Sequence, residues 1–354
     1  MATRTTLVTV GGFLGAGKTT LIARAAAALT ARGKRVVVVT NDQAPDLVDT
    51  QIVALTGVPT AEVAGACFCC AFPDFAAKAD ALIAAHQPDV VLAEPVGSCV
   101  DIAATVLRPL AEQRPDVYRI APFTVVVDPA AWRAAADGLE MDPATAYIYR
   151  KQIAEADLVA LNKCDLETSS ALAECEAELL ACCPAVEVRR VSAADGAGLE
   201  AWLDEVLAES TGGQRRIAVD YDTYAAGEAA LGWLNAELEL EGDVAWPEVL
   251  DALMEGIAGR LPGVAHLKCL LRSGNLIQVS NAVAGRSVPV ARTLRAGAST
   301  SHARVTINAR VACEPAELRV VTEASIEALR EVRGVVSKLR AFAPGRPVPI
   351  HRVA

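Results

Sequence analysis

The sequence has no run of apolar residues that approaches the roughly 20 residues of a membrane-spanning helix. Its first apolar run, Leu7 to Val10, is four residues long and leads directly into a glycine-rich loop, so we expect no signal peptide and a cytoplasmic protein. Lysine and arginine number 33 against 43 acidic residues, and the net charge of −10 argues against a general nucleic-acid-binding role. We therefore expect neither a membrane nor a nucleic acid among the partners.

Aromatic residues are also scarce, at 4% of the chain. The composition is otherwise apolar and rich in alanine, which suits a globular α/β protein. A chain of 354 residues can bury a sizeable core, and two domains are the natural expectation at this length. The ten cysteines are expected to be thiols or metal ligands rather than disulfides, because a cytoplasmic compartment is reducing.

A complete phosphate-binding loop, Gly-Phe-Leu-Gly-Ala-Gly-Lys-Thr, spans residues 12–19. It lies between a predicted strand, Leu7 to Val10, and a predicted helix, Thr20 to Thr30. Its glycines let successive backbone N–H groups point at an anion. Lys18 would reach the β- and γ-phosphates, and the Thr19 hydroxyl would hold Mg²⁺. The nucleotide-binding residues predicted here are Gly12, Gly15, Ala16, Gly17, Lys18, Thr19 and Thr20.

Strand and helix patterns alternate over the first two hundred residues. Continuous apolar runs predict strands at Val36–Thr40, Asp89–Ala93, Phe123–Val127 and Leu158–Leu161. Helical periodicity occurs at Phe75–His86, Ala171–Cys182 and Leu199–Ala208. This alternation predicts an α/β fold with a doubly wound, mostly parallel sheet, in which ligands bind at the carboxyl ends of the strands.

The pattern changes after a linker rich in glycine, Ser210 to Gln214. We expect a first domain over 1–210, a linker over 211–215 and a smaller α+β domain over 216–354. Predicted elements of the smaller domain are alternating strands at Leu231–Leu240 and Arg304–Ala312, a hairpin of Val264–Leu271 with Leu276–Ser280, a helix from Pro247 to about Arg260, and a helix over Ser325–Leu339.

Asn162-Lys163-Cys164-Asp165 follows a short apolar strand and suits recognition of guanine. A carboxylate at Asp165 can accept two hydrogen bonds from the N1–H and N2–H₂ edge of guanine, whereas adenine leaves it unpaired at a cost of roughly 1–3 kcal/mol. Asn162 can reach N7 or a neighbouring loop, and the stem of Lys163 can cover the ring. Ser192 and Ala193 belong to a loop that would close over the base.

Two further loops are candidates for segments that sense the third phosphate. Glu94-Pro95-Val96-Gly97 ends the Asp89–Ala93 strand, where Glu94 can orient a Mg²⁺-bound water and the Gly97 N–H can contact a γ-phosphate. Asn41-Asp42 and Asp46–Asp49 follow the preceding strand and would form the other such segment, the first switch. The sequence does not single out the residue that positions the attacking water; Glu94 and Asp42 are the candidates. Lys18 and Thr19 complete the predicted catalytic set.

Cys67-Phe68-Cys69-Cys70 is the second prominent motif. In extended backbone Cys67 and Cys69 point to one side, and Cys70 points away unless the chain turns. Two or three thiolates within a few ångströms suit Zn²⁺, and also Co²⁺ or Ni²⁺. The alternative is three structural thiols in an apolar strand. Single cysteines elsewhere, Cys99 among them, are expected to pack as small apolar residues.

Taken together, these motifs resemble those of the CobW-type GTPases, a metallochaperone family related to the nickel-inserting GTPases of hydrogenase and urease maturation. The resemblance covers about the first 210 residues and has the family's order of motifs. It implies GTP binding, slow hydrolysis of GTP to GDP and phosphate, and delivery of a divalent metal such as Zn²⁺ or Co²⁺ to a client metalloprotein. It also implies a smaller C-terminal domain, and it assigns the metal-ligand role to Cys67, Cys69 and Cys70.

The sequence departs from the family pattern at several positions. Ala66 stands where Gly usually precedes the first cysteine, and Pro45 replaces a glutamate of the first switch. Pro95 and Val96 follow Glu94 where Ser or Thr and then Thr are commoner. The histidine-rich tract of many members is absent. These differences indicate a divergent subgroup, whose metal and client can differ.

The resulting hypothesis is a metal-coupled GTP switch, in which GTP and Mg²⁺ order both loops and thereby fix the cysteine thiolates. One alternative is a P-loop GTPase that gates cofactor loading of a metalloenzyme without carrying metal. Another is an ATP-dependent kinase of small molecules. The sequence leaves open whether the chain forms a homodimer.

Overall fold

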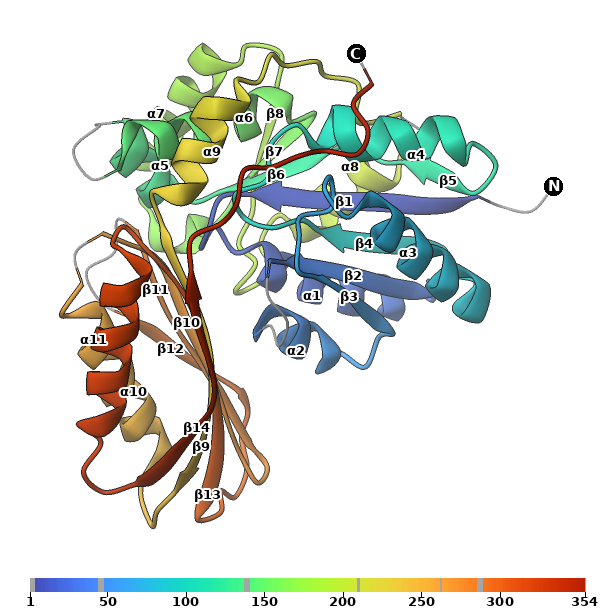
Figure 1. Ribbon diagram of the computed structural model, residues 1–354. Coiled ribbons are helices and arrows are strands. Elements are labelled where there is room, and N and C mark those ends of the chain that lie inside the picture. The colour runs from blue at the N-terminus through green and yellow to red at the C-terminus, as the bar shows by residue number, and fades with distance from the viewer. Residues whose placement is uncertain are drawn as a thin grey trace.

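The computed structural model describes residues 4–43, 48–136, 141–208, 211–261, 263–284 and 289–353. They form two sheets, one parallel and flanked by helices, the other antiparallel (Figure 1). Ala44 to Leu47 of the first switch, which include Pro45 and Asp46, and Ser210 of the linker lie outside the described residues. No described helix combines the length and the apolar character needed to cross a bilayer.

The parallel sheet has the strand order β3-β2-β4-β1-β6-β7-β8, and the short β5 also pairs with β1. Each of these pairings is parallel. The doubly wound α/β fold expected from the sequence is thereby confirmed. Its strands are β1 Thr5–Gly12, β2 Val36–Asp42, β3 Thr60–Ala64, β4 Val90–Glu94, β5 Tyr118–Ile120, β6 Thr124–Val127, β7 Leu158–Leu161 and β8 Glu187–Arg190.

Helices cover both faces of this sheet, because successive strand residues feed two different cores. Leu7, Val37 and Val91 belong to one apolar cluster, whereas their neighbours Val8, Val38 and Leu92 belong to the other. The helices are α1 Lys18–Ala31, α2 Val48–Ala54, α3 Phe72–His86, a π-helical turn Ala103–Leu107 continued by α4 Arg108–Gln113, α5 Pro129–Ala136, α6 Pro143–Glu155, α7 Ser169–Cys182, α8 Leu199–Leu207 and α9 Tyr221–Ala229.

The antiparallel sheet has the order β12-β11-β10-β13-β9-β14 and carries two helices on one face (Figure 1). Its strands alternate: Leu267 and Cys269 pack under the helices, while the intervening Lys268 belongs to the opposite face. The elements are β9 Gly232–Glu241, α10 Trp246–Ala258, β10 Val264–Ser273, β11 Leu276–Val283, β12 Val290–Arg295, β13 His302–Val311, α11 Pro315–Glu327 and β14 Arg333–Phe342. A smaller α+β C-terminal part is therefore confirmed.

The helix expected over Ser325–Leu339 is wrong. Helix α11 ends at Glu327, and Arg333–Phe342 pairs with β9 as an edge strand. Gly334 and the β-branched pair Val335-Val336 disfavour a helix, and β9 offers an edge with free hydrogen-bonding groups. The apolar residues within 325–339 are spaced as in a helix, but they belong to a helix end, a turn and a strand that pack into one core.

Segments after the predicted linker return to the parallel sheet. Helix α9 packs against α6, and the C-terminal tail crosses the parallel-sheet part (Figure 1). In the tail, the Ile350 N–H donates to the Cys69 carbonyl at 3.1 Å and the Val353 N–H to the Ala104 carbonyl at 2.9 Å. The boundary at 211–215 stays a prediction, since the antiparallel sheet begins only at Gly232.

Candidate functional site

The phosphate-binding loop joins the carboxyl end of β1 to the first turn of α1. Gly12, Gly15 and Gly17 have φ values of 129°, 74° and 101°, which a side chain disfavours. At Gly17 a Cβ would also come 2.3 Å from the Asn162 amide nitrogen. The Lys18 ammonium folds back over this loop and donates to the Phe13 carbonyl at 3.2 Å. Burial lowers the pKa of Lys18, so this cation lies in a site that favours a nearby anion.

Asn162, directly after β7, connects three loops of the site. Its amide nitrogen donates to the Ala16 carbonyl at 2.8 Å, and its oxygen accepts the Ala193 N–H at 2.9 Å. The neighbouring Lys163 ammonium donates to the Gly15 carbonyl at 2.8 Å and forms an ion pair with Asp128 at 2.6 Å. Asn162 therefore fixes the phosphate loop against the 192–193 loop.

The other predicted nucleotide-binding residues differ in their exposure and in their hydrogen bonds. Asp165 is exposed and lies at the edge of the pocket that the phosphate loop also lines. Thr20 and Ala193 line the same pocket. Ser192 accepts the Asp195 N–H at 3.2 Å, so its hydroxyl orders its own turn. Asp128 was not a predicted site residue; its position directly after the predicted strand Phe123–Val127 was the available signal.

Two carboxyl groups converge on the hydroxyl of Thr19. The distance from Thr19 Oγ1 is 2.7 Å to Asp49 and 2.9 Å to Glu94. Because a hydroxyl has one proton, it can donate fully to only one of them at a time. The second Glu94 oxygen is buried without a hydrogen-bond partner, and burial together with the charge of Asp49 raises the pKa of Glu94 to about 7. The oxygens of Thr19, Asp49 and Glu94 thus meet at one point, and hard oxygen donors of this kind suit a Mg²⁺ ion.

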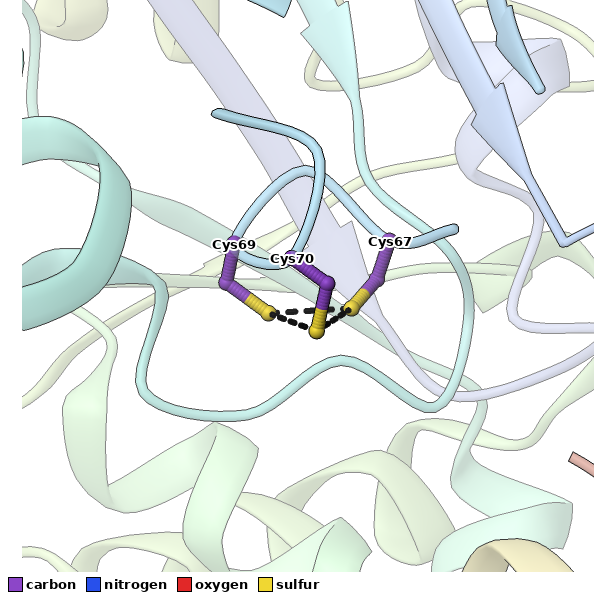
Figure 2. A group of neighbouring side chains, drawn as sticks. All are labelled: Cys67, Cys69 and Cys70. Atoms are coloured by element: carbon purple, nitrogen blue, oxygen red, sulfur yellow. Dashed lines mark hydrogen bonds between the residues drawn. The ribbon is translucent and has the colours of Figure 1, made fainter. Parts of the chain in front are cut away.

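The cysteines lie on a tight turn between β3 and α3, not on a strand (Figure 2). The N–H groups of Cys70 and Ala71 both donate to the Cys67 carbonyl, at 3.0 and 2.9 Å. This turn brings the Cys70 sulfur to 3.3 Å from Cys67 and 3.7 Å from Cys69, and the latter two are 2.9 Å apart. The expectation that Cys70 points away applies to extended backbone only, and the chain turns here.

The three sulfurs form one polar cluster within a largely apolar core. Hydrogen bonds from the neighbouring thiols lower the pKa of Cys67, whereas the pKa of Cys69 rises because of the same hydrogen bonds and of burial. The Val348 N–H of the C-terminal tail adds a donor to the Cys70 sulfur at 3.2 Å. All three sulfurs lie close enough to one another to bind a single metal ion, and soft thiolates suit Zn²⁺ or Co²⁺.

Asn41, at the carboxyl end of β2, holds the cysteine turn in place. Its amide nitrogen donates to the carbonyls of Val63 and Ala66 at 2.8 and 2.7 Å. Its oxygen accepts the Phe68 N–H at 2.8 Å, within the turn itself. The residue that precedes Asp42 in the first switch is thus in direct contact with the cysteine motif.

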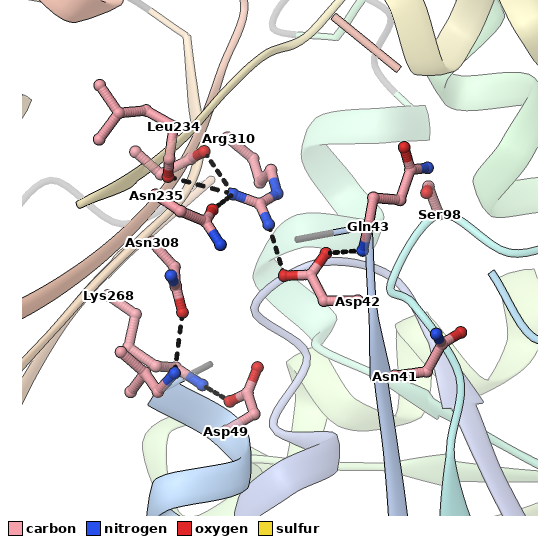
Figure 3. Close-up of polar contacts among 12 residues, drawn as sticks. Asn41, Asp42, Gln43, Asp49, Ser98, Leu234, Asn235, Lys268, Asn308 and Arg310 are labelled. Carbon is pink, nitrogen blue, oxygen red and sulfur yellow. Dashed lines mark hydrogen bonds and ion pairs between the residues drawn. The ribbon is translucent and has the colours of Figure 1, made fainter. Parts of the chain in front are cut away.

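The antiparallel sheet closes the other side of the site with basic side chains (Figure 3). Arg310 forms an ion pair with Asp42 at 2.7 Å, and both side chains are almost fully buried. Lys268 forms an ion pair with Asp49. The Val48 N–H donates to the Asn308 side-chain oxygen at 3.0 Å. Asp42 is therefore held by a cation from the other sheet, and the first switch is bound at both ends.

One pocket is lined by both parts of the chain. Its walls include the phosphate loop, Glu94, Gly97 and Asp165 on one side, and His266, Lys268, Arg292 and Arg310 on the other. Gly97 lies against the phosphate loop, since a Cβ there would be 2.7 Å from Leu14 and 3.1 Å from the Lys18 ammonium. The sequence analysis did not predict that Lys268, Arg292 and Arg310 line this pocket; for Arg310 the available signal was the alternation within Arg304–Ala312.

We expect strong coupling between Asp42 and Arg310 in a double-mutant cycle of Asp42→Asn and Arg310→Met. Each single change leaves one buried polar group without its partner, so the coupling in the free energy of unfolding should be about 2 kcal/mol or more. Urea denaturation measures it. The half-exposed pair Arg304–Glu239, also on β13, is the control and should give below about 1 kcal/mol. Equal coupling in the two pairs would contradict a structural role for the buried one.

Without metal or nucleotide, Glu94 should make the protein less stable as pH rises from about 4.5 to about 7. The folded state binds the Glu94 proton more tightly than the unfolded chain, so the penalty is absent below this window and complete above it, on the order of 3 kcal/mol. The charged groups that face Glu94 are Lys18, Asp49 and Lys268.

Thermal and urea unfolding in EDTA across this pH range measures the effect. Glu94→Gln should remove that part of the pH dependence, while Glu239→Gln, which changes an exposed carboxyl group, should retain it. Identical pH profiles for wild type and Glu94→Gln would show that Glu94 ionises normally.

Comparison with solved structures finds similar chains at low identity. Hydrogenase maturation factor HypB from Archaeoglobus fulgidus is 17% identical and covers 56% of this chain and 87% of its own, with a TM-score of 0.40. HypB from Helicobacter pylori in complex with nickel is 18% identical over 57% and 84%, also with a TM-score of 0.40. The Zn(II)-bound YjiA GTPase from E. coli is 16% identical over 93% and 99%, again with a TM-score of 0.40.

None of the curated proteins compared with the chain matches it significantly. The sequence pattern described as "CobW/HypB/UreG, nucleotide-binding domain" matches residues 6–190. This range contains the phosphate loop, the cysteine turn, Glu94 and Asn162 to Asp165. Because the match spans more than half of the 354 residues, the chain belongs to the CobW/HypB/UreG family.

Proposed function

We propose that this chain is a GTP-dependent metallochaperone, which binds GTP, hydrolyses it slowly, and couples its nucleotide state to binding and delivery of Zn²⁺ or Co²⁺. The observation that carries the proposal is the cluster of three thiols on a turn held by Asn41, the residue before Asp42. Membership of the family supports the nucleotide-binding half. In this proposal the client is a metalloprotein in the cytoplasm. The described contacts neither require nor oppose a homodimer.

In this proposal the phosphate loop holds the triphosphate, from Gly12 to Thr20. Lys18 exchanges its contact with the Phe13 carbonyl for the β- and γ-phosphates, and the Gly97 N–H contacts the γ-phosphate. Thr19, Asp49 and Glu94 would hold Mg²⁺, which neutralises developing charge on the phosphates when bound. Asp165 accepts from guanine, Lys163 covers its ring, and the loop of Ser192 and Ala193 closes beside it.

Glu94 is the better candidate for the residue that positions the attacking water. Both oxygens of Asp42 are engaged, one by Arg310 and the other by the Gln43 N–H at 2.6 Å. Glu94 retains one oxygen without a hydrogen-bond partner, and this oxygen can accept a hydrogen bond from the attacking water.

The coupling between nucleotide and metal runs through the carboxyl end of β2. Asp42 and Asn41 are neighbours, and the second holds the cysteine turn through three hydrogen bonds. A change in the first switch on loss of the γ-phosphate would therefore alter the geometry of the thiolates. By linkage, if GTP tightens metal binding, metal tightens GTP binding by the same factor.

Metal titration tests the thiol cluster. Zn²⁺ and Co²⁺ should bind the Cys67→Ser, Cys69→Ser variant about 100-fold or more weakly than wild type, because two of three sulfur ligands are lost. Wild type should also show different affinities with and without a non-hydrolysable GTP analogue. Cys182→Ser, at an exposed thiol ending α7, is the matched control. If the double variant binds metal like the control, the thiols are packing residues and the alternative of a GTPase without metal cargo is favoured.

Nucleotide competition tests the guanine site. Wild type should prefer GTP to ATP, and Asp165→Ala should lose about 1–3 kcal/mol of that preference because the carboxylate acceptor is removed. Asp116→Ala, at an exposed carboxylate in the turn before β5, should leave the preference unchanged. An ATP preference in wild type would contradict this assignment and favour a small-molecule kinase.

A further inference from the structure

The ammonium group of Lys268 reaches the nucleotide site from the antiparallel sheet. Lys268 of β10 is 9% exposed and forms an ion pair with Asp49 of the first switch (Figure 3). The oxygen of Asp49 that it contacts, Oδ1, is the one that also lies 2.7 Å from the Thr19 hydroxyl. A single carboxylate oxygen therefore separates a lysine of the second sheet from the last residue of the phosphate loop.

The charges around Thr19 determine what this lysine meets when a nucleotide binds. Asp49 and Glu94 contact the Thr19 hydroxyl, Lys18 precedes it in the loop, and Lys268 lies on Asp49. All five side chains line one pocket. Mg²⁺ on these oxygens would bring positive charge beside Lys268 and take over its place on the carboxylate, whereas the triphosphate would supply new anionic oxygens.

The position of Lys268 favours the γ-phosphate over the other phosphates and the base. A Mg²⁺ ion held at a P-loop threonine bridges the β- and γ-phosphates, so a cation beside Thr19 and Asp49 faces that end of the nucleotide. The N–H groups of the phosphate loop enclose the β-phosphate from the side of the parallel sheet. The γ-phosphate is the group that remains accessible to a side chain from the antiparallel sheet.

Arg310, the neighbouring cation of this sheet, is held too firmly for the same role. Its guanidinium group pairs with Asp42 at 2.7 Å, donates to the Asn235 side-chain oxygen at 3.0 Å, and stacks over the Trp233 ring at 3.9 Å. By contrast, the Lys268 ammonium has one hydrogen-bond acceptor among the residues that the structure describes. Its flexible four-carbon stem lets the ammonium exchange that acceptor for another.

We propose that Lys268 is a ligand of the γ-phosphate, supplied by the antiparallel sheet, and that it helps the protein to distinguish GTP from GDP. The inference rests on the proposed GTP-binding function and deepens it. With GDP the ammonium stays on Asp49, and with GTP and Mg²⁺ it moves to the γ-phosphate. Hydrolysis thereby changes a contact between the first switch and the antiparallel sheet, so the second sheet responds to the third phosphate.

Isothermal titration of Lys268→Met with Mg²⁺ and either GDP or a non-hydrolysable GTP analogue tests the residue. The variant should bind the analogue about tenfold or more weakly than wild type, because it loses a charge-assisted hydrogen bond, and should bind GDP within about threefold of wild type. Effects through Asp49 and Mg²⁺ act on both nucleotides, so the ratio of the two affinities is the readout.

Lys338→Met is the matched control for this titration, since Lys338 is an exposed lysine of β14 that also pairs with a carboxylate, Glu237, at 3.3 Å. It should keep the wild-type ratio of affinities. If Lys268→Met keeps that ratio as well, the role of Lys268 is overturned. Circular dichroism checks that both variants fold.

Crystal structures of wild type with Mg²⁺ and either the GTP analogue or GDP test the inference without any substitution. Lys268 Nζ should lie about 2.7–3.2 Å from a γ-phosphate oxygen in the first complex and on Asp49 in the second. An ammonium that stays on Asp49 in both complexes would overturn the inference and leave the proposed function intact. Failure of wild type to bind the analogue would overturn both.

Discussion

The carboxamide of Asn41 joins the two halves of the candidate site, and the rest of the arrangement depends on it. Its hydrogen bonds fix the carboxyl end of β2 against the cysteine turn. Each such bond contributes only about 1 kcal/mol in net terms, but a buried amide without partners is costly, so the set behaves as a unit. The turn, in turn, decides that the Cys70 sulfur faces those of Cys67 and Cys69.

Buried charge is the second constraint. Asp42 and Glu94 are buried and Asp49 is partly buried, and Asp42 and Asp49 are compensated by Arg310 and Lys268 from the antiparallel sheet. Buried ion pairs of this kind contribute little net stability, because desolvation offsets the attraction. They do fix geometry: the second sheet can approach only where its cations meet these carboxylates. A triphosphate and its metal ion would bring new charges into the same pocket and compete for the same partners.

Local features were easier to predict from the sequence than contacts between distant segments. Strand and helix positions in the parallel-sheet part were predictable because apolar periodicity and the glycine loop are local. The helix predicted over Ser325–Leu339 failed because β14 is stabilised by pairing with β9, some hundred positions earlier, rather than by its own sequence. The direction of Cys70 likewise depends on a turn that Asn41 holds from another strand.

By itself, the order of residues determined the phosphate loop, the motif Asn162–Asp165, the cysteine motif and the doubly wound fold, since each depends on neighbours along the chain. Only the tertiary structure decided that Arg310 meets Asp42 across 268 positions and that Lys268 meets Asp49. Such contacts depend on how the sheets twist and pack, and a lone arginine or lysine carries no local signal of its future partner.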